Sequence, residues 1–163
     1  MASSHGKPNR KRIKLGDIVE IVTPNGLAYA QYTHKHDLPP RWGALIKVLP
    51  GLFTKRPKDF KELVMQQERF YVFFPLGPAV YRDIVRIVGH EEIPERCRPF
   101  PLFKATNNLR TDKVKTWWLW DGVKSWRVGQ LQPEHFNLPI KQIVNDTMLV
   151  YLITHDWTPR DEV

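Results

Sequence analysis

The stretch DIVEIVTPNGLAYAQYT, residues 17–33, contains two apolar runs separated by a turn signal. Pro24-Asn25-Gly26 offers the positive φ that a hairpin turn needs, because glycine has no Cβ to clash there. Apolar runs of this length between turn residues are typical of strands. We therefore predict strands at Asp17 to Thr23 and Leu27 to Thr33, joined by a tight turn.

Apolar runs of similar length recur along the chain and indicate a mixed or antiparallel sheet. Pro50-Gly51 ends the third run, Leu76-Gly77-Pro78 turns the chain into the fifth, and Gly89 ends it. Polar or proline-rich segments between the runs predict a loop over 34–41, an extended crossing over 91–101 and a surface loop over 104–113. The further predicted strands are Ala44 to Leu49, Phe70 to Phe74 and Val80 to Val88.

A second hairpin is predicted around Asp121-Gly122, because a two-residue Asp-Gly loop favours a type I′ turn. That turn pairs Trp120 with Val123, Trp118 with Ser125 and Trp117 with Trp126. Trp117, Leu119 and Trp126 then share one face, and Trp118, Trp120 and Val123 share the other. Because both faces carry tryptophan, we expect a second covering layer, supplied by the C-terminal segment or by a partner, with the chain itself favoured.

Helical periodicity is confined to two short segments. Between Pro57 and Gln67, apolar residues fall on one helical face, and Asp59 with Glu62 fits a capping box. Asn145 fits an N-cap for a helix over 146–153, although Val150 and Tyr151 suit a strand equally, and we favour the helix.

These elements predict an α+β fold in a single domain over residues 13–163, preceded by a flexible basic arm over residues 1–12. We expect a strongly bent antiparallel sheet, or a small partly open barrel, with one or two short helices. At 163 residues and 42% hydrophobic content, one core is sufficient.

Composition indicates a cytoplasmic protein with no membrane partner. No run approaches the ~18 apolar residues that span a bilayer, and the basic, polar start lacks the apolar segment of a secretory signal. The single cysteine, Cys97, cannot form an internal disulfide, so no oxidising compartment is required. We interpret Cys97 as a small semi-buried residue of the core.

The net charge of +8 is concentrated at the N-terminus, where residues 1–14 carry five basic and no acidic residues. The other 20 basic and 17 acidic residues leave the body at only +3. The basic arm and an aromatic sheet face nevertheless keep a nucleic-acid-binding protein as the alternative function.

No pattern in the chain predicts catalysis, a metal site or a cofactor. His34 and His36 have alternate spacing, but Lys35 separates them and only Asp37 is a local third ligand. His90-Glu91-Glu92 starts like a zinc-protease motif, yet Pro94 stands where the second histidine belongs. Glycines are scattered singly, so no phosphate-binding loop exists. We expect no catalytic residue, no metal, no cofactor and hence no enzyme.

Several stretches of the chain carry a family resemblance, and they span most of residues 13–153. They are Leu15 to Ile21, Tyr29-Ala30-Gln31, Gly43 to Val48, Phe70 to Phe74, Trp117 to Gly122, Leu138-Pro139 and Asn145. Taken together they resemble the bacterial immunity protein 26 family, whose members are small α+β proteins of polymorphic toxin systems. The resemblance implies an antitoxin-like protein that neutralises a cognate toxin by binding and occlusion, without catalytic residues. The basic charge departs from the acidic charge common in inhibitors of cationic nucleases.

Candidate contacts with a protein partner follow from residue type, because tryptophan and arginine dominate the energetics of interfaces. Arg41 and Trp42 lie beside the Pro39-Pro40 loop, and Trp126 lies on the second hairpin. We predict these three as partner-contact residues. Ordinary packing or solvation is the alternative for each.

Overall fold

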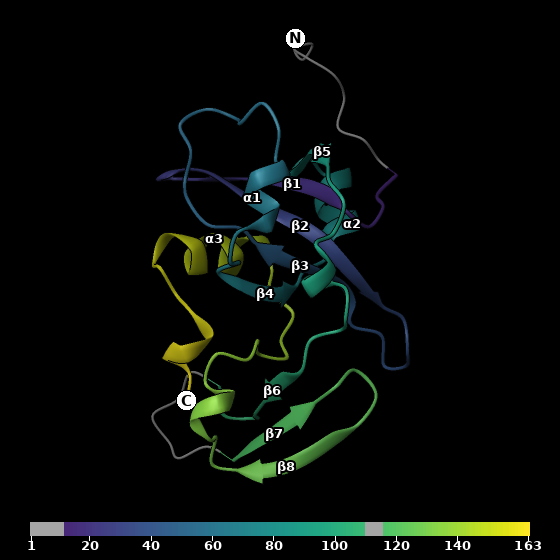
Figure 1. Cartoon of the computed structure of the whole chain (residues 1–163), viewed down its shortest axis with the longest axis vertical. Coiled ribbons are helices and arrows are strands. Elements are labelled where there is room, and N and C mark those ends of the chain that lie inside the picture. The colour runs from purple at the N-terminus through teal and green to yellow at the C-terminus, as the bar shows by residue number, and fades with distance from the viewer. Residues whose placement is uncertain (1–11, 110–115) are drawn as a thin grey trace.

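The computed structural model describes residues 12–109 and 116–163, and it is built on a five-stranded antiparallel sheet. The strand order is β4-β3-β2-β1-β5. Figure 1 shows this sheet above a second, smaller sheet. The bounds are β1 (Asp17–Thr23), β2 (Gly26–His36), β3 (Gly43–Val48), β4 (Phe70–Phe73) and β5 (Arg86–His90).

The hairpin predicted from residues 17–33 is confirmed. Thr23 pairs with Gly26 across a two-residue turn, and Gly26 has the positive φ of +135° that the turn requires. β2 is longer than predicted and runs through His34 to His36, so the loop predicted over 34–41 begins three residues too early. That extension pairs with Gly43 to Leu45 of β3 and so belongs to the five-stranded sheet.

Two helices cover one face of the five-stranded sheet, and side chains of this face and of both helices form the main core. These are α2 (Leu76–Tyr81) and α3 (Asp146–Thr154). The helix predicted over 146–153 is confirmed, and Asn145 caps it by accepting a hydrogen bond from the Met148 N–H at 2.8 Å. The strand predicted over Val80 to Val88 is wrong in its first half, because Val80 belongs to α2.

The opposite face is covered by α1 (Lys61–Met65) and the preceding loop, which pack Phe60 and Val64 against Ile18 and Tyr29. The helix predicted between 57 and 67 is therefore present but shorter. Its predicted capping box is wrong, because Asp59 accepts a hydrogen bond only from the Lys61 N–H and no side chain caps the helix.

The second sheet is antiparallel, with order β6-β7-β8 over β6 (Phe103–Ala105), β7 (Trp117–Trp120) and β8 (Ser125–Gly129). The predicted register is wrong: Trp120 pairs with Ser125 and Leu119 pairs with Trp126, across the turn 121–124. Asp121 Oδ1 closes this longer turn by accepting hydrogen bonds from the N–H groups of Val123 and Lys124. β6 also overlaps the first two residues of the segment predicted as a surface loop over 104–113, of which 110–113 fall outside the described residues.

Residues 139–144 join the two sheets. Pro139 and Lys141 exchange backbone hydrogen bonds with Lys104 of β6, and residues 142 and 144 exchange them with Phe73 of β4. In place of one strongly bent sheet, the structure has two antiparallel sheets connected by the backbone hydrogen bonds of residues 139–144. The described strands do not close into a barrel.

The remaining turns are three 3-10 helices within irregular segments. The first interrupts the predicted crossing segment 91–101, and the other two precede and follow α3. No helix in the described ranges is long and apolar enough to cross a membrane. The three turns are Glu95–Cys97, Pro133–His135 and Pro159–Asp161.

Candidate partner-binding surface

β8 ends the small sheet, and none of the described residues pairs with its outer edge. A strand with an unpaired edge presents backbone N–H and C=O groups in a row, which another chain can extend. The side chains along this edge are also exposed, with Val123 at 71% and Trp126 at 42%. We call this set the β8 surface: Val123, Lys124, Ser125, Trp126 and Arg127.

Trp126 differs from the other tryptophans of the chain, all of which lie in the described part. It is the one tryptophan among the exposed large apolar residues. No ring contact or side-chain hydrogen bond joins its indole to another described residue. Exposed tryptophan without an intramolecular role is rare, because its large apolar ring is costly to hydrate. Trp126 is therefore available to a partner.

The sheet under Trp126 is rigidly supported by the C-terminal segment. Trp117 and Leu119, which share the face of Trp126, are 2% and 4% exposed. Lys104 lies on this face and donates hydrogen bonds to the carbonyls of Phe136, Pro159 and Glu162. Its ammonium also lies 5.3 Å from the Trp117 ring centroid. The predicted cover by the chain itself is thus confirmed for β7, while β8 projects beyond it.

Trp42 is half-buried in an aromatic cluster between the sheets. Its ring lies 5.6 Å from Phe73 and 5.9 Å from Trp120, between centroids. The ammonium of Lys141 sits over both tryptophans, 4.9 Å from Trp42 and 4.4 Å from Trp120. Burial lowers the pKa of Lys141. Trp42 therefore has a packing role, and any partner would reach only its outer edge.

His36 fixes the Pro39-Pro40 loop against the second hairpin. Its Nε2 donates to the Gly122 carbonyl at 2.7 Å, and its Nδ1 accepts from the Trp42 N–H at 3.2 Å. Arg41, beyond this anchor, is exposed and donates to the Asp37 carbonyl at 3.2 Å. The structure thus brings Arg41 and Trp42 to one side of the hairpin.

Trp126 lies on the opposite face of that hairpin. Trp120, which contacts Trp42, pairs with Ser125, so the neighbouring Trp126 points the other way. The three residues predicted as partner contacts do not form one patch. Sequence analysis missed Val123, Lys124 and Arg127 as neighbours of Trp126, because the register error placed Val123 within the sheet.

The best arrangement for acid-base chemistry is the pair Asp17 and His90. Asp17 is fully buried and lies 3.0 Å from His90 Nδ1, while it also accepts from the Lys14 N–H at 2.9 Å. His90 lines an open groove of about 520 Å³ that His34 also lines. His34 is already bonded through both ring nitrogens, to Thr33 Oγ1 and the Arg98 carbonyl. The bond between His90 and Asp17 links the facing ends of β5 and β1, where the two residues pair in the sheet.

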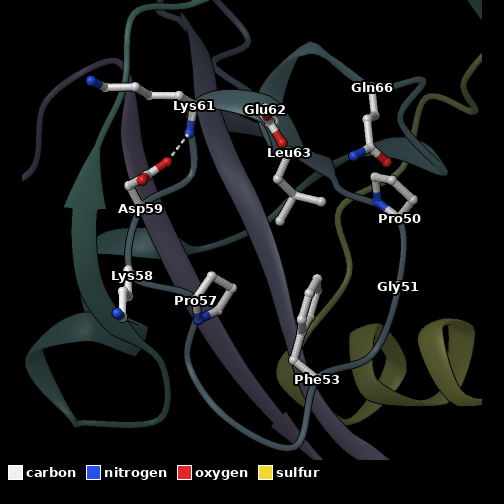
Figure 2. Close-up of a pocket in the computed structure, with 10 residues that line it drawn as sticks. All are labelled: Pro50, Gly51, Phe53, Pro57, Lys58, Asp59, Lys61, Glu62, Leu63 and Gln66. Atoms are coloured by element: carbon white, nitrogen blue, oxygen red, sulfur yellow. Dashed lines mark hydrogen bonds between the residues drawn. The ribbon is translucent and has the colours of Figure 1, made fainter.

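The hollow in Figure 2 has a volume of about 670 Å³ and lies between the loop after β3 and α1. Phe53 and Leu63 face each other across it. Lys58 and Lys61 at its rim are balanced by Asp59 and Glu62, so it has no net charge to select an anion.

An ion pair between the buried Glu20 and the half-exposed Arg56 holds the loop that forms this hollow. Arg56 donates to both oxygens of Glu20, at 2.8 and 3.0 Å, and the Tyr29 hydroxyl donates to Oε2 at 2.8 Å. Burial alone would raise the pKa of Glu20, but the hydrogen bonds from Arg56 and Tyr29 outweigh burial and lower it. Both carboxylate oxygens of Glu20 accept hydrogen bonds, and these bonds hold the loop that carries Arg56 against the sheet.

Among the described residues, no group of three or more histidine, cysteine or acidic side chains is placed to hold a metal ion. Comparison with models of known families, with curated proteins and with solved structures finds no match. The resemblance to the immunity protein 26 family therefore stays a prediction from the sequence.

Proposed function

We propose that this protein is a non-catalytic protein-binding domain that recognises its partner through the β8 surface. The observation that carries the proposal is Trp126, which is 42% exposed on an unpaired edge strand and whose indole makes no ring contact or side-chain hydrogen bond with another described residue. A partner strand laid along β8 would gain backbone hydrogen bonds, and the indole would anchor it. Val123 extends the apolar area at the turn.

The partner suggested by the family resemblance is a cognate toxin, neutralised by occlusion of its working surface. Lys124 and Arg127 flank Trp126 and favour a partner surface that carries acidic groups. β8 is held on one side by its ladder with β7, so its strand conformation is already formed before a partner binds. Occlusion needs no catalytic group in the inhibitor.

The test is capture of a stoichiometric protein from native, nuclease-treated lysate by the tagged full chain, in wild type and as Trp126→Ala. We expect truncation of the indole to weaken capture by at least about tenfold, the effect of losing a hot-spot tryptophan. Met65→Ala is the matched control, because Met65 is 63% exposed on α1, remote from β8 in the fold. The captured protein, purified, should lose its toxic activity when the wild-type chain is added.

Equal capture by wild type and Trp126→Ala would contradict the role of the β8 surface. A captured protein whose activity is unaffected by the chain would contradict the immunity function and leave a binding domain of another kind. Retention of nucleic-acid-associated proteins alone, lost as salt is raised above ~150 mM, would favour the nucleic-acid alternative instead.

A further inference from the structure

Lys47 and Cys97 form a buried pair on the face of the five-stranded sheet that α1 covers. Lys47 is fully buried and Cys97 is 2% exposed. The Lys47 ammonium donates to Cys97 Sγ at 3.3 Å and to the Val64 carbonyl at 2.9 Å. Two nucleophilic side chains from distant parts of the sequence thus lie within reach of one bond-forming step.

Tyr71 completes the surroundings of the sulfur atom. It is directly opposite Lys47 in the β3–β4 ladder, so the two side chains share a face. Its hydroxyl hydrogen-bonds Cys97, and burial together with this bond raises the pKa of Tyr71. Tyr71 therefore stays protonated and donates toward the sulfur, as Lys47 does.

No carboxylate pairs with Lys47 in the described part of the chain. The side-chain atom that accepts from the Lys47 ammonium is Cys97 Sγ. The thiolate is the form in which a cysteine is oxidised by peroxides.

We propose that hydrogen peroxide drives formation of a covalent S–N bond between Cys97 Sγ and Lys47 Nζ. Peroxide transfers one oxygen atom to the Cys97 thiolate, giving a sulfenic acid and hydroxide, and the hydroxide takes a proton from the Lys47 ammonium to form water. The freed amine attacks the sulfenic sulfur, and its proton leaves with the sulfenic oxygen as a second water. Sulfur is oxidised by two electrons and peroxide is reduced by two.

The bond would tie β3 to the turn at Glu95–Cys97 and so fix the crossing segment 91–101 over α1. It is independent of the β8 surface, which lies on the other sheet. Excess thiol would reverse it, because sulfenamides are reduced by thiols.

The test is treatment of the folded, full-length protein with hydrogen peroxide, followed by digestion without reductant and mass spectrometry. We expect a peptide pair containing Lys47 and Cys97, about 2 Da lighter than the sum of its parts, that separates on addition of dithiothreitol. Protein unfolded in urea before treatment should give at least about tenfold less of it, because proximity is lost.

Treated Lys47→Met should carry oxidised Cys97 without a cross-link, and Cys97→Ser should give no product. If either variant fails to fold, the cross-link measurement on the wild-type protein is sufficient to test the proposal. Sulfinic acid at Cys97 without a Lys47 adduct, a disulfide between two chains, or no oxidation of Cys97 would each overturn the proposal.

Discussion

Lys104 shows how one buried charged residue holds distant parts of this molecule together. Its ammonium donates to three backbone carbonyls of the C-terminal segment, and the residue is fully buried. Leaving buried carbonyls without donors costs about 1–3 kcal/mol each, less where water enters.

We expect Lys104→Met to lower the free energy of unfolding by about 3 kcal/mol, measured by urea denaturation. Methionine retains most of the volume, so the loss reports the hydrogen bonds. Lys58→Met, in an exposed position at the hollow of Figure 2, is the control and should change stability by less than about 0.5 kcal/mol. A Lys104 variant as stable as the control would mean that water replaces the ammonium at no cost.

The residue contacts that the sequence did not predict belong mostly to lysines, a residue type that is usually exposed. Lys47 and Lys104 are both fully buried. Lys104 falls in the segment predicted as a surface loop, and Lys47 falls in a predicted strand with no contact predicted for its side chain. Their partners, Val64, Cys97 and the C-terminal carbonyls, are remote in sequence, so no local pattern predicts the contacts. Gly26 and Asn145 were predicted correctly because a turn and a helix cap depend on neighbours within three residues.

At the scale of elements, two turn signals in the sequence predicted the wrong local structure. Leu76-Gly77-Pro78 predicts a turn, yet it forms the first turn of α2, where proline is tolerated because its missing N–H has no helical partner. Asp121-Gly122 predicts a two-residue loop, but the Asp121 carboxylate accepts from two backbone N–H groups and stabilises a four-residue turn. Phe100 also packs against Gly122, a tertiary contact that the local sequence does not specify.

The loop between β3 and α1 gives a prediction for pH dependence. The lowered pKa of Glu20 means that its bonds to Arg56 and Tyr29 favour the ionised, folded form. Their stabilisation is present above the ordinary value of 4.5 and is lost as pH falls through the lower folded value. At pH 7 we expect Glu20→Gln to be less stable than wild type by about 2 kcal/mol, a difference that shrinks below pH 4.5 in urea titrations.

Glu62→Gln is the control for that titration, because Glu62 is an exposed carboxylate of the same region, on α1. Its difference from wild type should stay near zero from pH 7 downward. A Glu20→Gln difference that persists unchanged below pH 4 would show that shape, not charge, holds the loop.

At the scale of the whole molecule, the segment 139–144 is the backbone connection between the two sheets, and we expect it to couple their unfolding. The element order predicted an α+β fold correctly, but no sequence pattern marks 139–144 as a connecting strand. Its hydrogen bonds to Lys104 and Phe73 link strands from different sheets, and its Lys141 ammonium lies over Trp42 and Trp120. The same connection positions β8 at the end of the molecule farthest from β5 (Figure 1).

Replacing Lys141 by proline removes the N–H that donates to the Lys104 carbonyl at 2.9 Å. Four of the six tryptophans lie on β7 and β8, so indole fluorescence reports mainly the small sheet, whereas far-ultraviolet circular dichroism reports both sheets. In wild type we expect the two urea transitions to coincide, as for a two-state domain. In Lys141→Pro the fluorescence transition should move to lower urea and separate from the dichroism transition.

The control is Lys141→Ala, which removes the ammonium and keeps the N–H. We expect its fluorescence and dichroism transitions to shift together. Separate transitions in this variant as well would mean that the Lys141 side chain, and not the backbone hydrogen bond, couples the unfolding of the two sheets.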